Sequence, residues 1–173
     1  MPSSAMLGLH IIPDKELIMT TTTNPPAVID PDGYAVSRTI TIAAPQERVW
    51  AAVTEPDHIA KWAGQSASMD RIEVGGRGTW TFDGYGTVPL EIEELNPPHS
   101  IAYRWGNAKY PDIDPGQSTV FRFTLEPIEG GTRLTVVESG FDTLGDPAAR
   151  MEDNRGGWTS ELDELVAYLE GAA

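Results

Sequence analysis

The sequence predicts an α+β domain in which a strongly curved, seven-stranded antiparallel sheet wraps around one long C-terminal helix. Three observations support this fold class. One strand is followed directly by two short helices, six strands of alternating apolar pattern come next, and a long helical pattern ends the chain. Because short turns separate the later strands, consecutive strands are expected to pair as antiparallel neighbours.

The chain has the size and composition of one globular domain. Its 173 residues include 40% hydrophobic residues, which is enough for a single buried core. Cysteine is absent, and this excludes disulfides, thiolate metal sites and cysteine nucleophiles. We therefore expect a protein of a reducing compartment, the cytoplasm.

Residues 1–34 are expected to form a flexible N-terminal tail, and residues 35–171 the folded domain. The tail is rich in polar and turn-forming residues and has no sustained periodicity. No Lys or Arg precedes Lys15, so the N-terminus does not resemble a secretory signal. The sequence leaves open whether translation starts at Met1 or at Met19.

The first strand and the two short helices are expected between residues 35 and 62. The first strand covers 35–42, where Val36, Ile40 and Ile42 lie on the same face. Pro45 suits the first position of a helix over 45–53, because its ring fixes φ near the helical value. Thr54 is the expected N-cap of the second helix, which ends near Trp62.

The remaining strands alternate apolar and polar residues and are separated by Gly, Pro and Asn. Gly75 and Gly76 are expected to form a tight hairpin turn between the second and third strands. A loop rich in Pro, Asp and Gly occupies 107–117. The six strands are expected at 68–74, 77–83, 87–95, 99–105, 118–126 and 132–139.

The last element is an amphipathic helix with a clear start signal. Asp146 is the expected N-cap and Pro147 the first helical residue. Gly156 and Gly157 lie inside the helix, where each glycine costs about 1 kcal/mol relative to alanine. We expect either a kink there or a close approach by another element. The apolar face consists of Trp158, Leu162, Leu165, Val166 and Leu169.

A single helix is too narrow to cover the inner face of a seven-stranded sheet, so we expect a cavity between them. For any one inward-facing residue, packing in the core is the simpler explanation. Together, the aromatic residues exceed what a small core needs, and they favour a hydrophobic ligand site. The expected ligand-binding residues are Trp62, Trp80, Phe82, Leu90, Ile92, Tyr103, Trp105, Phe121, Phe123, Trp158 and Leu162.

Signals for catalysis and for metal binding are weak. The histidines are scattered and no metal-ligand spacing occurs, so we expect no metal and no cofactor. Glu91 and Glu93 fall on the strand face that is expected to meet water. Glu138 continues an inward register and is the one weak catalytic candidate, because a buried carboxyl suits acid or base work. A strand-end carboxylate that reaches water is the simpler interpretation.

The formal charge of −14 repels nucleic acid and anionic membranes, so neither is expected as a partner. No apolar run approaches the roughly 20 residues that a membrane-spanning helix needs. The part of the chain after Val137 is especially acidic, and an alternative to a solvated helix face is a docking surface for a basic protein partner. The sequence also leaves a homodimer open.

Several motifs, taken in order, resemble one known family. The chain is similar to domains related to the activator of the heat-shock protein 90 ATPase, which belong to the START-like (SRPBCC) superfamily, also called birch-pollen allergen-like. The resemblance spans about residues 35 to 170. Its motifs are Ala44-Pro45-Gln46-Glu47-Arg48-Val49-Trp50, Pro56-Asp57-His58-Ile59-Ala60-Lys61-Trp62, Val74-Gly75-Gly76, the run from Glu94 to Trp105, and Gly157-Trp158 followed by Leu162 and Leu165.

The resemblance implies a helix-grip fold, with ligand binding as the expected function. Members of the superfamily bind hydrophobic small molecules, and some catalyse reactions such as polyketide cyclisation. The eukaryotic activator has a separate chaperone-binding domain, and a tail of 34 residues is too short to supply it. We expect binding of a small hydrophobic or aromatic ligand rather than catalysis. The alternatives are a cyclase- or hydrolase-type enzyme and a protein-interaction or stress-related co-chaperone-like module.

Overall fold

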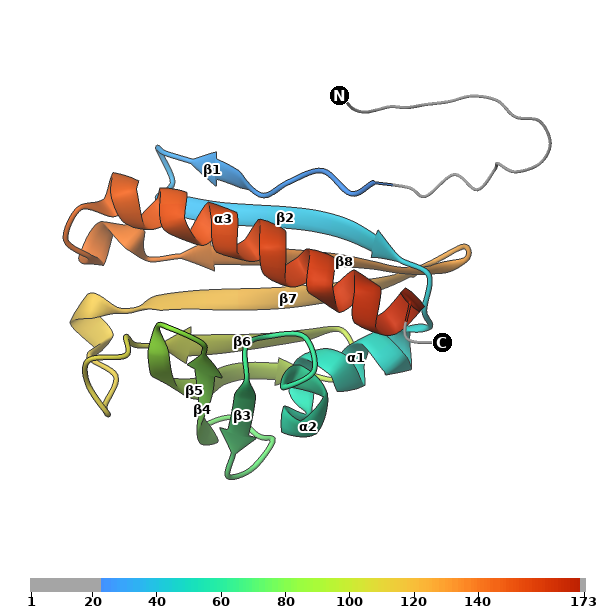
Figure 1. Ribbon diagram of the computed structural model, residues 1–173, viewed down its shortest axis with the longest axis horizontal. Coiled ribbons are helices and arrows are strands. Elements are labelled where there is room, and N and C mark those ends of the chain that lie inside the picture. The colour runs from blue at the N-terminus through green and yellow to red at the C-terminus, as the bar shows by residue number, and fades with distance from the viewer. Residues whose placement is uncertain (1–22, 172–173) are drawn as a thin grey trace.

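The computed structural model describes residues 23–171 and confirms the predicted α+β fold, with one antiparallel sheet and a long C-terminal helix (Figure 1). The sheet has eight strands in the order β1-β2-β8-β7-β6-β5-β4-β3. The strands are β1 Val28–Asp30, β2 Ala35–Ile42, β3 Ser66–Met69, β4 Arg77–Phe82, β5 Gly86–Asn96, β6 Ser100–Trp105, β7 Thr119–Ile128 and β8 Gly131–Ser139. The helices are α1 Gln46–Thr54, α2 Pro56–Ile59 and α3 Pro147–Val166, followed by a π-helical turn at Ala167–Gly171; short 3₁₀ turns lie at Pro115–Gln117 and Phe141–Thr143.

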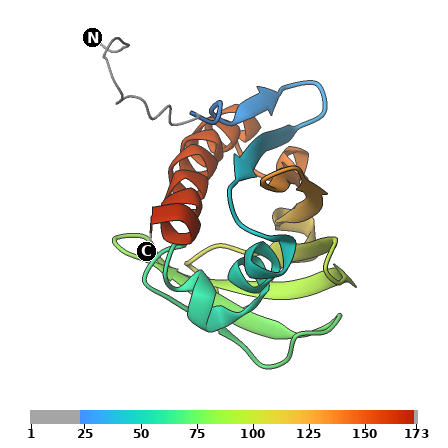
Figure 2. The same ribbon diagram turned by 90° about the vertical axis from the view of Figure 1, so that its right-hand side faces the viewer.

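The sheet curves around α3, and the two short helices close one end of the space between them. Figure 2 shows the strands curling round from β1 and β2 towards β4 and β5, with α3 along the open side. The apolar residues of β2, β7 and β8 that the alternation placed inward are buried, including Phe121, Phe123 and Leu134. Strand β8 pairs with β2 on one side and with β7 on the other along its whole length. Within the described part of the chain, no helix is both long and apolar enough to cross a membrane.

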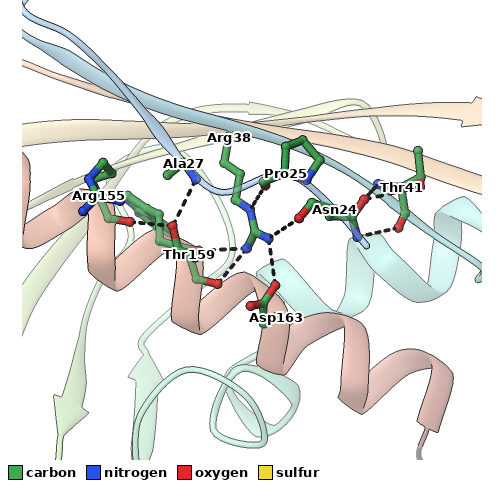
Figure 3. Close-up of polar contacts among 9 residues, drawn as sticks. Asn24, Pro25, Ala27, Arg38, Thr41, Arg155, Thr159 and Asp163 are labelled. Carbon is green, nitrogen blue, oxygen red and sulfur yellow. Dashed lines mark hydrogen bonds and ion pairs between the residues drawn. The ribbon is translucent and has the colours of Figure 1, made fainter. Parts of the chain in front are cut away.

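The eighth strand lies in a segment that the sequence pattern had assigned to the tail. Val28–Asp30 pairs antiparallel with β2, and an arginine holds the segment before it against α3. Arg38 lies on the inward face of β2 and is only 3% exposed. Its guanidinium donates to the backbone oxygens of Pro25 and Thr159 and to Asp163 Oδ1, each at 2.7 Å (Figure 3). A buried cation is tolerated here because oxygens replace its lost water.

The strands on either side of Gly75 and Gly76 pair as the predicted hairpin, β3 with β4, but the expected tight turn at the two glycines is wrong. Strand β3 ends at Met69, and residues 70–76 form a longer loop to β4. Gly75 donates its backbone N–H to the Ile92 oxygen and the Gly76 oxygen accepts from Ile92, so both glycines pair with β5. Asp70 is the first residue of this loop. Its side chain accepts from the backbone N–H of Arg77, the first residue of β4, at 2.8 Å and so joins the two ends of the loop.

Thr54 does not cap α2 as the sequence suggested. It is the last residue of α1, and its hydroxyl donates back to the Trp50 carbonyl at 2.7 Å. Glu55 occupies the N-cap position of α2, with Pro56 as the first helical residue. Because the Thr54 hydroxyl is hydrogen-bonded one turn earlier in α1, it does not cap α2.

Helix α3 begins where the sequence predicts and passes through its two glycines without a break. The Asp146 side chain accepts from the Ala149 backbone N–H at 3.4 Å, and Pro147 is the first helical residue. A Cβ added to Gly156 or Gly157 would meet no atom within 4 Å. The alternative of a close approach by another element is therefore wrong, and both glycines border open space.

A candidate ligand-binding cavity

A cavity of about 420 Å³ lies between α3 and the half of the sheet formed by β4, β5 and β6. Such a volume is in the range of small-molecule sites. Strand β4 and the segment after α2 form one wall, and α3 forms another. The lining residues are Trp62, Ala63, Trp80, Phe82, Tyr85, Val88, Trp105, Gly106, Asn107, Gln117, Ser118, Thr119, Leu144, Gly145, Arg150, Asp153, Asn154, Gly157, Trp158 and Glu161.

Aromatic rings from four parts of the chain meet at the cavity and hold one another in place. The Trp105 and Trp158 rings stack with their centroids 5.9 Å apart, so a β6 residue contacts an α3 residue across the sheet face. Trp80 of β4 meets Trp105 edge-on, also at 5.9 Å. Trp62 is fixed by its indole N–H, which donates to the Ala52 carbonyl at 2.7 Å. The walls are therefore stiff and apolar before any ligand enters.

The residues expected to bind ligand fall into two layers. The first layer lines the cavity and consists of Trp62, Trp80, Phe82, Trp105 and Trp158. The second layer does not line the cavity but is buried in the core: Leu90, Ile92, Tyr103, Phe121, Phe123 and Leu162.

Tyr103 shows how the second layer is held. Its hydroxyl donates to the Val53 carbonyl of α1 at 2.7 Å, and burial raises the pKa of the Tyr103 phenol far above its ordinary value. Phe121 packs against Trp105 with centroids 4.4 Å apart. The core layer thus supports the rings that face the cavity.

Glu138 is fully buried and does not reach water, contrary to the simpler interpretation of its position. Its Oε1 accepts from Trp158 Nε1 at 2.8 Å and from Asn154 Nδ2 at 3.0 Å. Its Oε2 accepts from Trp105 Nε1 at 2.9 Å and from the Thr119 hydroxyl at 2.5 Å, and Asn154 reaches this oxygen as well, at 3.0 Å.

The partners of Glu138 define what its carboxylate does. Trp105, Thr119, Asn154 and Trp158 all line the cavity, whereas Glu138 does not. Two indoles, one amide and one hydroxyl donate hydrogen bonds to Glu138. An ionised carboxylate can only accept such bonds, so donors and acceptor are complementary. One buried carboxylate behind the wall therefore fixes four wall residues from β6, β7 and α3.

Glu161 is an acidic group on the cavity surface and is not one of the residues of the predicted apolar face of the helix. It lies three residues after Trp158, on the same side of α3, and its side chain is half-buried. Burial, and secondarily the negative charge of Glu164, raises the pKa of Glu161 to about 7. Its position in the cavity could have been predicted from its helical spacing, three residues after Trp158 and four after Gly157.

Two further features of the cavity lining concern Trp80 and Gly157. The buried Trp80 indole nitrogen has no hydrogen-bond partner among the described residues. Gly157 lines the cavity, whereas Gly156 beside it does not. A side chain at position 157 would narrow the cavity, so the costly glycine leaves it open.

No group of three or more metal-ligating side chains occurs among residues 23–171. His58 accepts or donates a 2.7 Å hydrogen bond with the Tyr168 hydroxyl, which ties α2 to the end of α3. His10 lies outside the described residues.

Comparison with solved structures shows the same fold in bacterial proteins. Protein MLL2253 from Mesorhizobium loti is 26% identical, with a TM-score of 0.68 over 80% of this chain and 98% of that one. DynU16, from the dynemicin biosynthetic locus, is 26% identical with a TM-score of 0.66 over 79% of this chain, which spans 47% of DynU16. The Aha1 dimer from Colwellia psychrerythraea is 21% identical, with a TM-score of 0.64 over 79% of this chain and 96% of that one, and it shows the fold alone.

The family assignment rests on the sequence comparison. No curated protein matches the chain significantly. A family model, Activator of Hsp90 ATPase homolog 1-like protein, matches residues 43–170, from the end of β2 to the end of the C-terminal helix. This range contains the cavity lining and Glu138. The chain belongs to the family of Activator of Hsp90 ATPase homolog 1-like proteins.

Proposed function

We propose that the protein binds a small, largely apolar or aromatic molecule in the cavity between α3 and the sheet. The observation that carries the proposal is a cavity of about 420 Å³ lined by six aromatic side chains, four of them indoles, at the junction of α3 with β4 and β6. Five indole and phenyl groups supply a large apolar contact area. A few polar groups, among them Asn107, Gln117 and Asn154, orient a ligand.

Glu138 supports this function as a positioning residue. Its carboxylate holds the two indoles that stack at 5.9 Å, so the wall keeps its shape when the cavity is empty. A preformed wall lowers the ordering cost of binding. Proton transfer between Glu138 and a bound molecule is disfavoured, since the carboxylate lies behind the wall with both oxygens already bonded.

The proposal is tested with indole and naphthalene as probes in thermal unfolding and isothermal titration calorimetry. Only the folded state has the cavity, so a probe at about 100 times its Kd is expected to raise the free energy of unfolding by about 2.7 kcal/mol. Native mass spectrometry of the purified protein checks independently for a carried-over molecule. Absence of binding by both probes, and of any carried-over molecule, contradicts the proposal.

Gly157→Leu and Gly156→Leu form a matched pair for locating the site. Both replace a helical glycine by leucine, and neither new Cβ meets an atom within 4 Å. Only Gly157 lines the cavity. We expect Gly157→Leu to weaken probe binding at least about tenfold and Gly156→Leu to leave it within about twofold. Equal effects of the two variants place the probe elsewhere.

A further inference from the structure

The two ends of the cavity along α3 differ in charge. Lining residues recur on this helix from Arg150 to Glu161. Arg150 and Glu161 are eleven positions apart, which is about 16 Å along an α-helix, so these two side chains mark opposite ends of the site. Tyr168, two turns beyond Glu161, bonds His58, which places the Glu161 end towards α2. A ligand that fills the cavity lengthwise meets Glu161 at one of its ends.

The Arg150 end of the cavity carries charges of both signs, whereas the Glu161 end carries a negative charge with no basic residue within one turn of α3. Arg150 and Asp153 are three residues apart, a spacing at which opposite charges on a helix attract each other, and Asp153 is exposed to water. Glu161 makes no hydrogen bond or ion pair with another residue of the described range 23–171. Its neighbour one turn on is the like-charged Glu164.

We propose, building on the proposed function, that the ligand carries a basic nitrogen next to its aromatic or apolar body, and that Glu161 binds this nitrogen. The walls suit such a molecule, because indole and phenyl faces attract cations as well as apolar groups. The formal charge of −14 adds a general attraction for cations. A ligand carboxylate, in contrast, meets repulsion at this end.

Glu161 favours a cation for a further reason. Burial and Glu164 together raise the pKa of Glu161 to about 7, so its charged form is destabilised in the empty cavity. A bound ammonium offsets the effect of both causes, because its positive charge stabilises the ionised carboxylate. The other titratable groups around the cavity are Arg150 and Asp153 at its far end and Tyr85 on the turn between β4 and β5.

Tryptamine and tryptophol test the inference, because they differ only in an amine and a hydroxyl. The amine stays protonated from about pH 5.5 to about pH 8.5, whereas Glu161 ionises within that range. By calorimetry, the wild-type protein is expected to bind both probes similarly at the lower pH. At the higher pH it is expected to prefer tryptamine by roughly tenfold.

Two variants complete the experiment. Glu161→Gln is expected to abolish the preference for tryptamine at every pH while tryptophol still binds. Glu164→Gln removes an equal charge from an exposed residue outside the cavity lining. It is expected to keep the preference and to lower the pH at which it appears, because a like charge next to Glu161 is gone.

The outcomes separate this inference from the proposed function. Equal binding of both probes at the higher pH, or an unchanged preference in Glu161→Gln, overturns the assignment of Glu161 but leaves ligand binding in place. If neither probe binds and indole and naphthalene also fail, both proposals are wrong. A preference that disappears only in Glu161→Gln supports the inference.

Discussion

Trp158 donates its indole N–H to Oε1 of Glu138 at 2.8 Å, which links the long helix to the last strand beneath the cavity. The bond joins residues on the two elements that define this fold, α3 and β8. Because Glu138 also holds Trp105, the stacked indoles on opposite elements share one acceptor group. Cavity shape and helix docking therefore depend on the same carboxylate.

Glu138→Gln is expected to destabilise the protein by about 1–3 kcal/mol, measured by urea denaturation. The amide N–H₂ replaces an acceptor, so one or more buried donors lose their partner. Glu126→Gln is the matched control, because Glu126 is exposed and pairs only with Arg133 at 2.9 Å. The control is expected to change stability by less than about 0.5 kcal/mol. Equal losses in the two variants would contradict the importance of the buried carboxylate.

Arg38→Met is expected to lower the free energy of unfolding by about 2–4 kcal/mol and to release the segment that carries β1. The apolar side chain leaves the Pro25 and Thr159 carbonyls without their guanidinium partner. Hydrogen exchange should increase selectively at residues 27–30. Asp163→Asn is the control, and its cost should stay below about 1 kcal/mol because the Asp163 side chain is 62% exposed. Unchanged exchange in Arg38→Met would show that β1 does not depend on this contact.

Gly156→Ala and Gly157→Ala are each expected to stabilise the protein by about 0.5–1 kcal/mol. Both glycines lie within α3, and a Cβ at either position meets nothing within 4 Å. Thermal unfolding measures the gain. A lower melting temperature in either variant would show that the helix needs glycine there for its backbone conformation.

Stability is expected to fall as the pH rises from about 4.5 to about 7, in part because of Glu161. The folded state holds the Glu161 proton up to about pH 7, whereas the unfolded state releases it near the ordinary glutamate pKa of 4.5. Between these values the unfolded state binds fewer protons, so unfolding becomes easier with rising pH. The contribution is about 1–2 kcal/mol, reduced from the full shift because part of the carboxylate faces water.

Glu161→Gln isolates this contribution. Its stability is expected to match that of the wild type below about pH 4.5 and to exceed it above about pH 7. Denaturant titrations across this range, run on both proteins, give the difference directly. A constant difference between the two curves would mean that Glu161 does not titrate differently in the folded state.

The sequence by itself determined the order of the elements from β2 onwards and the inward face of the longer strands. Alternation over β7 placed Phe121 and Phe123 inside, and the Asp146-Pro147 pair marked the start of α3. Such signals are local, because strand period, helix period and capping depend on neighbouring residues. The resemblance in motif order added the family, which the match over residues 43–170 then established.

Only the tertiary structure decided which inward residues line a cavity and which fill the core. Tyr103 and Trp105 share one face of β6, yet Trp105 borders the cavity and Tyr103 bonds α1. The burial of Glu138 depends on donors up to 33 residues away, and that of Arg38 on α3, 120 residues further along the chain. A polar residue can be buried where residues distant in the sequence supply its hydrogen bonds, and a local sequence pattern does not reveal those partners.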